Sequence, residues 1–143
     1  MLLDANILVY AVDDASPRHA AASAWLEAQL NGDRRVGIPW ESLMAFIRVT
    51  THPRIAVRPL TPEAAWSHVE DWLRVPVVWV PLPTDRHAAV LGPLVEKYRP
   101  TGNLVPDAHL AALAIEHGAE VISTDTDFAR FTEIRWRNPL AGL

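Results

Sequence analysis

The sequence predicts an α/β fold in three layers, with helices on both faces of a central parallel sheet. Short apolar segments alternate with longer segments of amphipathic helical spacing. This alternation implies a parallel sheet that is covered on both faces. At 143 residues, the chain has the length of one domain, and we expect a single domain over residues 1–143.

Five short segments are expected as strands. The third lies between prolines and is β-branched and aromatic, which is typical of a strand. After the first strand, residues 7–12 either extend it or begin a helix, and the pattern leaves both open. The expected strands are residues 2–4, 35–38, 77–80, 120–123 and, as a further candidate, 134–136.

Five segments are expected as helices: residues 19–30, a segment from 40, a segment from 61, residues 84–98 and residues 106–117. The one from Thr61 has a cap and a proline in the first turn, and Gly118 is expected to end the last. Gly92 and Pro93 interrupt the pattern of the fourth. The faces expected to be buried are Ala22, Trp25, Leu26 and Leu30; Trp40, Leu43, Met44 and Ile47; Trp66, Val69 and Leu73; and Leu110, Leu113, Ala114 and His117.

Composition excludes several classes of chemistry. The absence of cysteine removes thiol catalysis, disulfides and cysteine-bound zinc. The chain begins without a signal-peptide pattern and has no apolar run of membrane-spanning length, so we expect a cytoplasmic protein without a membrane partner. Its net charge of −4 argues against unassisted nucleic-acid binding. That argument weakens if several acids are gathered around metal ions.

Acidic residues follow the predicted strands at the edge where open parallel sheets bind their ligands. Asp4 ends the first strand, and Asp125 and Asp127 follow the fourth. Asp107 and Glu41 each lie at the start of a helix, where backbone N–H groups favour a carboxylate. Hard divalent cations prefer such oxygen ligands and promote phosphodiester hydrolysis. A single acid at a helix start is also a common structural cap.

Four segments lie in order along the chain: LLDANIL at residues 2–8, PWESL at 39–43, NLVPDAHLAALA at 103–114 and STDTDF at 123–128. Together they resemble the PIN-domain family. Within the family the chain is most similar to the VapC toxins of VapBC toxin–antitoxin pairs, particularly over residues 106–114 and in the DFARF segment. This resemblance implies a three-layer α/β/α fold, RNA cleavage with Mg²⁺ or Mn²⁺, a cognate antitoxin and a homodimer.

The resemblance also implies roles for individual residues. Asp4 and Asp107 are the implied principal metal ligands, and Asp125 binds the metal directly or through water. Glu41 completes the site as a ligand or as a base that orients water. Asn6 and Thr124 are the groups implied to hold the carboxylates in place.

The last acidic segment leaves an ambiguity between Asp125 and Asp127. If the chain is extended there, we expect only one of these two carboxylates to enter the site. We favour Asp125, and we expect Asp127 to cap the following turn.

Basic and aromatic residues outside the acids suggest partner contacts. Arg48 and Arg54, with Arg58, follow the glutamate helix and either bind an RNA backbone or solvate a loop. The six histidines form no evident metal-binding pair, and His109 is expected as a packed or surface residue. Some of the tryptophans suit a dimer or antitoxin interface, although core packing is the ordinary role.

Two other classes of function share this topology. A phosphatase or dehalogenase with an aspartate nucleophile usually needs a second aspartate two residues after the first, where this chain has Asn6. A non-catalytic module, either receiver-like or a PIN domain that only binds a partner, is the other alternative. A receiver domain needs a lysine after a late strand, whereas Lys97 falls in a predicted helix.

Overall fold

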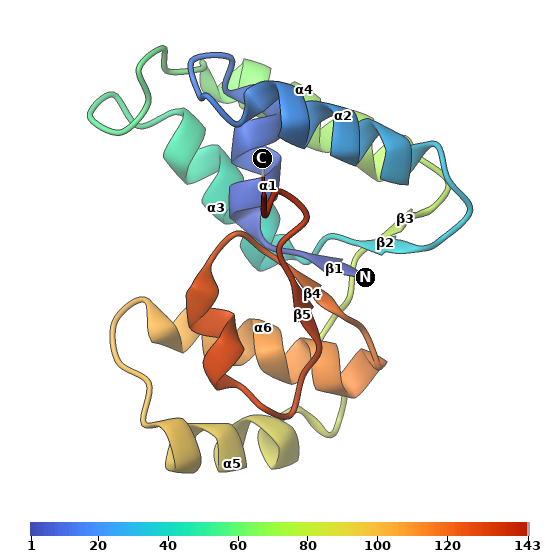
Figure 1. The fold of residues 1–143 in the computed structure, drawn as a ribbon, viewed down its shortest axis with the longest axis vertical. Helices are drawn as coiled ribbons and strands as arrows, with labels where there is room; N and C mark the ends of the chain where they lie inside the picture. The colour runs from blue at the N-terminus through green and yellow to red at the C-terminus, as the bar shows by residue number, and fades with distance from the viewer. Residues whose placement is uncertain (143) are drawn as a thin grey trace.

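The structure is a computed structural model and describes residues 1–142. Strands of two residues alternate with longer helices along the chain (Figure 1). The elements are β1 (Leu2–Leu3), α1 (Ala5–Val12), α2 (His19–Leu30), β2 (Val36–Gly37), α3 (Trp40–Thr50), α4 (Pro62–Arg74), β3 (Val78–Trp79), α5 (His87–Tyr98), α6 (Leu104–His117), β4 (Val121–Ile122), a 3₁₀ helix η1 (Thr126–Arg130) and β5 (Trp136–Arg137).

The five strands form one parallel sheet in the order β3-β2-β1-β4-β5. β1 is central and pairs Leu2 with Gly37 on one side and with Val121 on the other. Successive side chains of β1 point to opposite faces of the sheet. Leu3 packs in the core under α1 to α4, whereas Leu2 packs in the core under α5 and α6. The predicted three-layer α/β/α fold is therefore confirmed.

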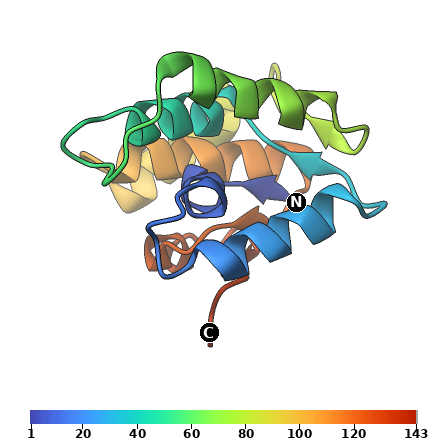
Figure 2. The same cartoon turned by 90° about the horizontal axis from the view of Figure 1, so that it is seen from above.

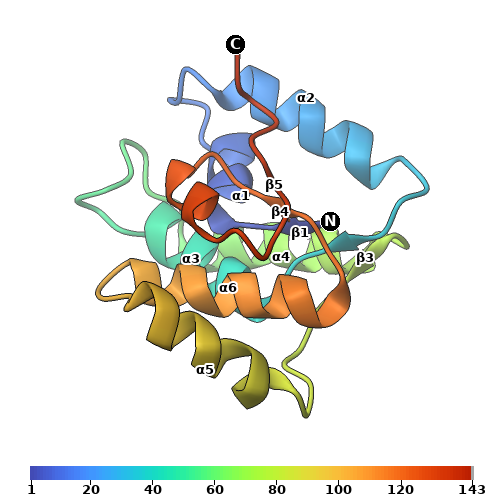
Figure 3. The ribbon, with the colours of Figure 1, turned by 60° about the horizontal axis from the view of Figure 1, so that its bottom comes forward.

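Figure 1 shows these two groups of helices on opposite sides of the sheet. Figure 2 shows α1 nearly end-on, between α2 on one side and α3 on the other, which agrees with the contacts of α1. Figure 3 shows α5 running beside α6, and these two helices form the layer on the other face of the sheet from α1 to α4. Among residues 1–142, no helix is both long enough and apolar enough to cross a bilayer.

Local signals in the sequence explain where several helices begin and end. Asp4 accepts a hydrogen bond from the Ala5 N–H and starts α1, so residues 7–12 are helical and do not extend the strand. Thr61 caps α4 as predicted, accepting from the Ala64 N–H at 3.1 Å. Gly118 ends α6 at a φ of 60°, a left-handed conformation that glycine adopts readily.

The predicted buried faces of α3 and α4 are partly wrong. In α3, Trp40 and Met44 are 39% and 57% exposed, and the buried face is formed by Ser42, Leu43, Phe46 and Thr50. In α4, Trp66 is 43% exposed, whereas Ala65, Val69 and Trp72 are buried. The two buried faces meet through the Phe46 and Trp72 rings, whose centroids lie 4.9 Å apart. Ser42 belongs to the inner face because its hydroxyl donates to the Leu3 carbonyl at 2.7 Å.

Candidate active site

Acidic side chains from three parts of the chain meet at the carboxyl edge of the sheet. Asp4 follows β1 and Asp125 follows β4, and these two strands are neighbours. Asp107 lies in the first turn of α6. Asp107, Asp125 and Asp127 each present a carboxylate oxygen within 4.8 Å of those of the other two. The parallel sheet therefore brings together acids that are more than a hundred residues apart in sequence.

The Asp4 carboxylate is held in place by three donors. One oxygen accepts from the Ala5 N–H at 2.8 Å. The other accepts from the Ser123 hydroxyl at 2.7 Å and from the Asn6 side-chain amide at 3.1 Å. Burial raises the pKa of Asp4 above its ordinary value, and the bonds from Ser123 and Ala5 offset only part of that rise. Asp4 is therefore an oriented carboxylate in a site that favours bound positive charge.

Ser123 is a site residue that the sequence analysis missed. It is fully buried, and its hydroxyl donates to Asp4 while accepting from the Asn6 amide at 2.9 Å and the Asp125 N–H at 3.0 Å. These contacts use the donor and both acceptor positions of a hydroxyl. The strand register would have identified it. Leu3 pairs with Ile122, so the residues that follow them, Asp4 and Ser123, lie side by side.

Thr124 contributes less than the family resemblance implied. Its backbone N–H donates to the Asn6 side-chain oxygen at 3.2 Å. Within residues 1–142, no hydrogen bond joins its hydroxyl to a carboxylate of the site. Asn6, by contrast, bonds Asp4, Ser123 and Thr124 together and lies where the sequence placed it.

The predicted capping role of Asp127 is wrong. Asp125 is the cap of η1, and its carboxylate accepts from the Asp127 N–H at 2.8 Å. The chain is not extended here, since it turns into η1 directly after Asp125. Both carboxylates therefore approach Asp107, and Asp127 also forms an ion pair with Arg130 at 3.5 Å.

Asp107 has the most perturbed carboxyl group of the cluster. Burial raises its pKa from 3.8 to about 7, reinforced by the negative charges of Asp125, Asp4 and Asp127. Arg130 offsets a part of this effect. Within residues 1–142, no protein donor lies at hydrogen-bonding distance from the Asp107 carboxylate. Its lone pairs are thus free for a cation or for water.

Glu41 lies at the start of α3 but is not one of the three clustered carboxylates. Its Oε1 atom lies 2.9 Å from Nε2 of His109. The side chain of Glu41 is 46% exposed. The structure therefore places Glu41 beside α6, with a histidine as its neighbour.

An open groove of about 1400 Å³ runs from these acids between α1, α2 and the α3–α4 segment. Asp4, Asp107 and Asp125 line it, and so do Arg48 and Arg58. Arg54 is exposed in the turn after α3 but does not line the groove. The groove thus joins the acidic cluster to one of the two arginines predicted to bind RNA.

The donor set of the cluster fits a hard divalent cation. All three clustered groups are carboxylates, and within residues 1–142 they form the one His/Asp/Glu group with ligand spacing. Mg²⁺ and Mn²⁺ prefer oxygen ligands of this kind and retain some of their water. A bound cation would also offset the like charges that raise the pKa of Asp107.

Comparison with known proteins agrees with this arrangement. The PIN domain family matches residues 1–134. The chain belongs to this family. Ribonuclease VapC37 of Mycobacterium tuberculosis is 45% identical over 142 residues, which is 99% of each chain. Ribonuclease VapC33 of the same organism is 38% identical over 137 residues, 96% of each chain.

Solved structures show the same fold at lower identity. The VapBC2 structure from Rickettsia felis, bound to a DNA fragment from its promoter, gives a TM-score of 0.70 at 19% identity, covering 96% of each chain. VapBC-1 from nontypeable Haemophilus influenzae gives 0.66 at 19% identity over 96% of each chain. The PIN fold therefore extends over nearly all of this chain, including the three segments that supply the acids.

Proposed function

We propose that this PIN domain is a divalent-metal-dependent endoribonuclease and the toxin of a toxin–antitoxin pair. The observation that carries the proposal is the meeting of Asp107, Asp125 and Asp127 beside Asp4 at the carboxyl edge of the sheet. The ribonuclease names of relatives that span the whole chain support the choice of RNA as substrate. The cytoplasm, where RNA is available, is the proposed site of action.

Asp4, Asp107 and Asp125 are the proposed metal ligands, and the metal is Mg²⁺ or Mn²⁺. When bound, such an ion polarises water and neutralises charge on the phosphate. Ser123 and Asn6 keep the Asp4 carboxylate in one orientation, so that its ligand atom is already placed before a cation binds. Asp127 contributes negative charge at the edge of the cluster.

Glu41 is the proposed base that orients the attacking water. Its carboxylate is half-exposed, and one of its oxygens is engaged by His109. The other oxygen is free of protein donors within residues 1–142. A general base must reach the water that it activates, and a partly held, accessible carboxylate suits this role.

The substrate is proposed to approach along the groove. Arg48 lines it, and Arg54 and Arg58 lie in the exposed segment after α3. Guanidinium groups bind phosphates in a bidentate manner, and such contacts position a backbone without reading its sequence. We propose that these arginines contact the RNA backbone.

The proposed protein partners are a cognate antitoxin and a second copy of the chain. The structures with the same fold are named as VapBC and FitAB assemblies, which supports an antitoxin partner. Trp40, Met44 and Trp66 expose large apolar side chains on α3 and α4. Aromatic residues and methionine are enriched in protein interfaces, which supports a homodimer or antitoxin contact there.

The test is cleavage of total cellular RNA by the purified protein with Mg²⁺, with Mn²⁺ and with a chelator. Discrete fragments that require the metal are expected for the wild type and are expected to disappear in Asp4→Asn and Asp107→Asn. Asp33→Asn, in an exposed loop before β2, is the matched control and should cleave like the wild type. Full metal-dependent activity in folded Asp4→Asn protein would contradict the assignment.

A further inference from the structure

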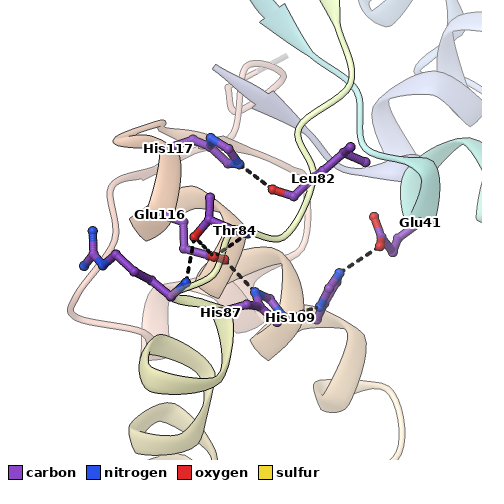
Figure 4. A network of polar contacts seen from close by, with 8 residues as sticks. Glu41, Leu82, Thr84, His87, His109, Glu116 and His117 are labelled. Atoms are coloured by element: carbon purple, nitrogen blue, oxygen red, sulfur yellow. Dashed lines mark hydrogen bonds and ion pairs between the residues drawn. The ribbon is translucent and has the colours of Figure 1, made fainter.

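A chain of polar contacts runs from Glu41 into the interior of the α5–α6 layer (Figure 4). His109 Nε2 lies 2.9 Å from Glu41 Oε1, and His109 Nδ1 lies 3.1 Å from His87 Nε2. His87 Nδ1 in turn lies 2.6 Å from Glu116 Oε2. The chain joins α3, α6 and α5, because His109 and Glu116 lie seven residues apart on one face of α6.

Glu116 anchors the inner end of this chain. Its side chain is fully buried, and its second oxygen accepts from both the N–H and the hydroxyl of Thr84, at 2.9 and 2.6 Å. Burial raises the pKa of Glu116, but the bonds from His87 and Thr84 outweigh this and leave it below its ordinary value. Glu116 is therefore an ionised acceptor, and His87 must present its Nδ1–H to it.

The outer end has a matching requirement. Glu41 offers a carboxylate oxygen, so the contact with His109 is a hydrogen bond only if His109 carries a proton on Nε2. The His87 and His109 rings pack edge-on at 72°, with Nε2 of His87 3.1 Å from Nδ1 of His109. The buried Glu116 carboxylate thus fixes the His87 ring, and the His87 ring packs against the His109 ring and limits its orientations.

We propose that His109, supported by His87 and Glu116, is a positioning residue for Glu41. A half-exposed glutamate side chain ordinarily samples several rotamers, and ordering it costs conformational entropy. The bond from His109 restrains one oxygen of Glu41, and within residues 1–142 the other oxygen has no protein donor. This proposal rests on the proposed function, because it assumes that the orientation of Glu41 matters for RNA cleavage.

The first experiment measures cleavage kinetics on a defined RNA substrate with the full chain. His109→Leu removes the donor, and we expect kcat to fall about tenfold with KM nearly unchanged, which is typical of losing a residue that orients an active-site group. His109→Gln keeps an N–H donor of similar reach and should recover most of the lost rate. Loss in His109→Gln as large as in His109→Leu would contradict the proposal.

A double-mutant cycle shows whether His109 acts through Glu41. In the Glu41→Gln background, His109→Leu should cause little further loss, because residues that act as one unit are not additive. Equal losses in both backgrounds would overturn the proposal. His117→Leu is the matched control. His117 lies on the same helix and its Nε2 lies 2.7 Å from the Leu82 carbonyl oxygen, but within residues 1–142 it makes no hydrogen bond to Glu41, His109, His87 or Glu116. Its kcat should equal that of the wild type.

A second experiment does not depend on activity, so that failure of the proposed function is distinguishable from failure of this inference. Nitrogen NMR of the histidine rings reports which ring nitrogens carry protons. We expect protonated Nδ1 for His87 and protonated Nε2 for His109, and we expect Glu41→Gln to shift the His109 signals while leaving those of His117 unchanged. Unchanged His109 signals would overturn the inference, whether or not the protein cleaves RNA.

Discussion

Asp107→Asn should stabilise the metal-free protein while removing its proposed activity. In the folded chain the Asp107 carboxyl has a pKa of about 7, first because of burial and then because of Asp125, Asp4 and Asp127. In the unfolded chain these causes vanish, and the pKa returns to its ordinary value of 3.8. The folded state thus holds a proton between about pH 4 and 7 that the unfolded state has lost. Folding stability therefore falls as pH rises through this window, and the whole cost is present above it.

The size of this cost follows from the raised pKa. A difference from 3.8 to about 7 corresponds to at most about 4 kcal/mol. Asp107 lines an open groove, so solvent screening reduces this to about 1–2 kcal/mol above neutral pH. For a chain of 143 residues, that free energy corresponds to a rise in Tm of about 3–6 °C.

The assay is thermal unfolding of wild type, Asp107→Asn and Asp33→Asn at several pH values between 4 and 8, with a chelator and then with Mn²⁺. With chelator at pH 8, Asp107→Asn should have the highest Tm, and its advantage should vanish near pH 4. Mn²⁺ should raise the Tm of the wild type more than that of Asp107→Asn, because a bound ligand stabilises the state that binds it. A Tm for Asp107→Asn at or below that of the wild type at pH 8 with chelator would refute the electrostatic reasoning.

Three further predictions concern the supports of the site. Ser123→Ala should lower the free energy of unfolding by about 1–3 kcal/mol and reduce RNA cleavage. It removes a donor to Asp4 and leaves the Asn6 side-chain amide and the Asp125 N–H without their acceptor. Urea unfolding and a cleavage assay check this. Asp125→Asn should weaken Mn²⁺ binding in calorimetry more than Asp127→Asn does, since Asp127 is shared with Arg130; the reverse order would assign Asp127 as the ligand. Gly37→Ala should cost about 1–3 kcal/mol, because its Cβ would lie 2.9 Å from the Pro81 ring and 3.1 Å from the Met1 carbonyl; an unchanged urea midpoint would contradict that contact.

Local sequence patterns were sufficient for the order of the strands and of α2 to α6, and for placing Asp4 after β1 and Asp107 in the first turn of α6, whereas α1 was left open and η1 was not predicted. A carboxylate that follows a buried strand, or that opens a helix, is positioned by bonds within a few residues of itself. The cap of α1 by Asp4 and the end of α6 at Gly118 are examples of such short-range control. The proposed metal site was therefore accessible from sequence, although its roles remain predictions.

The tertiary structure decided everything that depends on a neighbour from a distant segment. Helical spacing cannot distinguish the Trp40 and Met44 face of α3 from the Phe46 face, because that choice depends on α4 packing against it. The register of β1 with β4 selected Ser123 as the support of Asp4, in addition to the predicted Asn6.

The contact between His87 and His109 illustrates the same limit. The two residues are 22 positions apart on different helices, and no local pattern relates them. The packing of α5 on α6 brings their rings together, with Glu116 buried behind them. The sequence by itself determined which chemical groups the chain offers at each strand end and helix start. The tertiary structure determined which of them touch, because hydrogen bonds between side chains depend on distances that only the packed layers set.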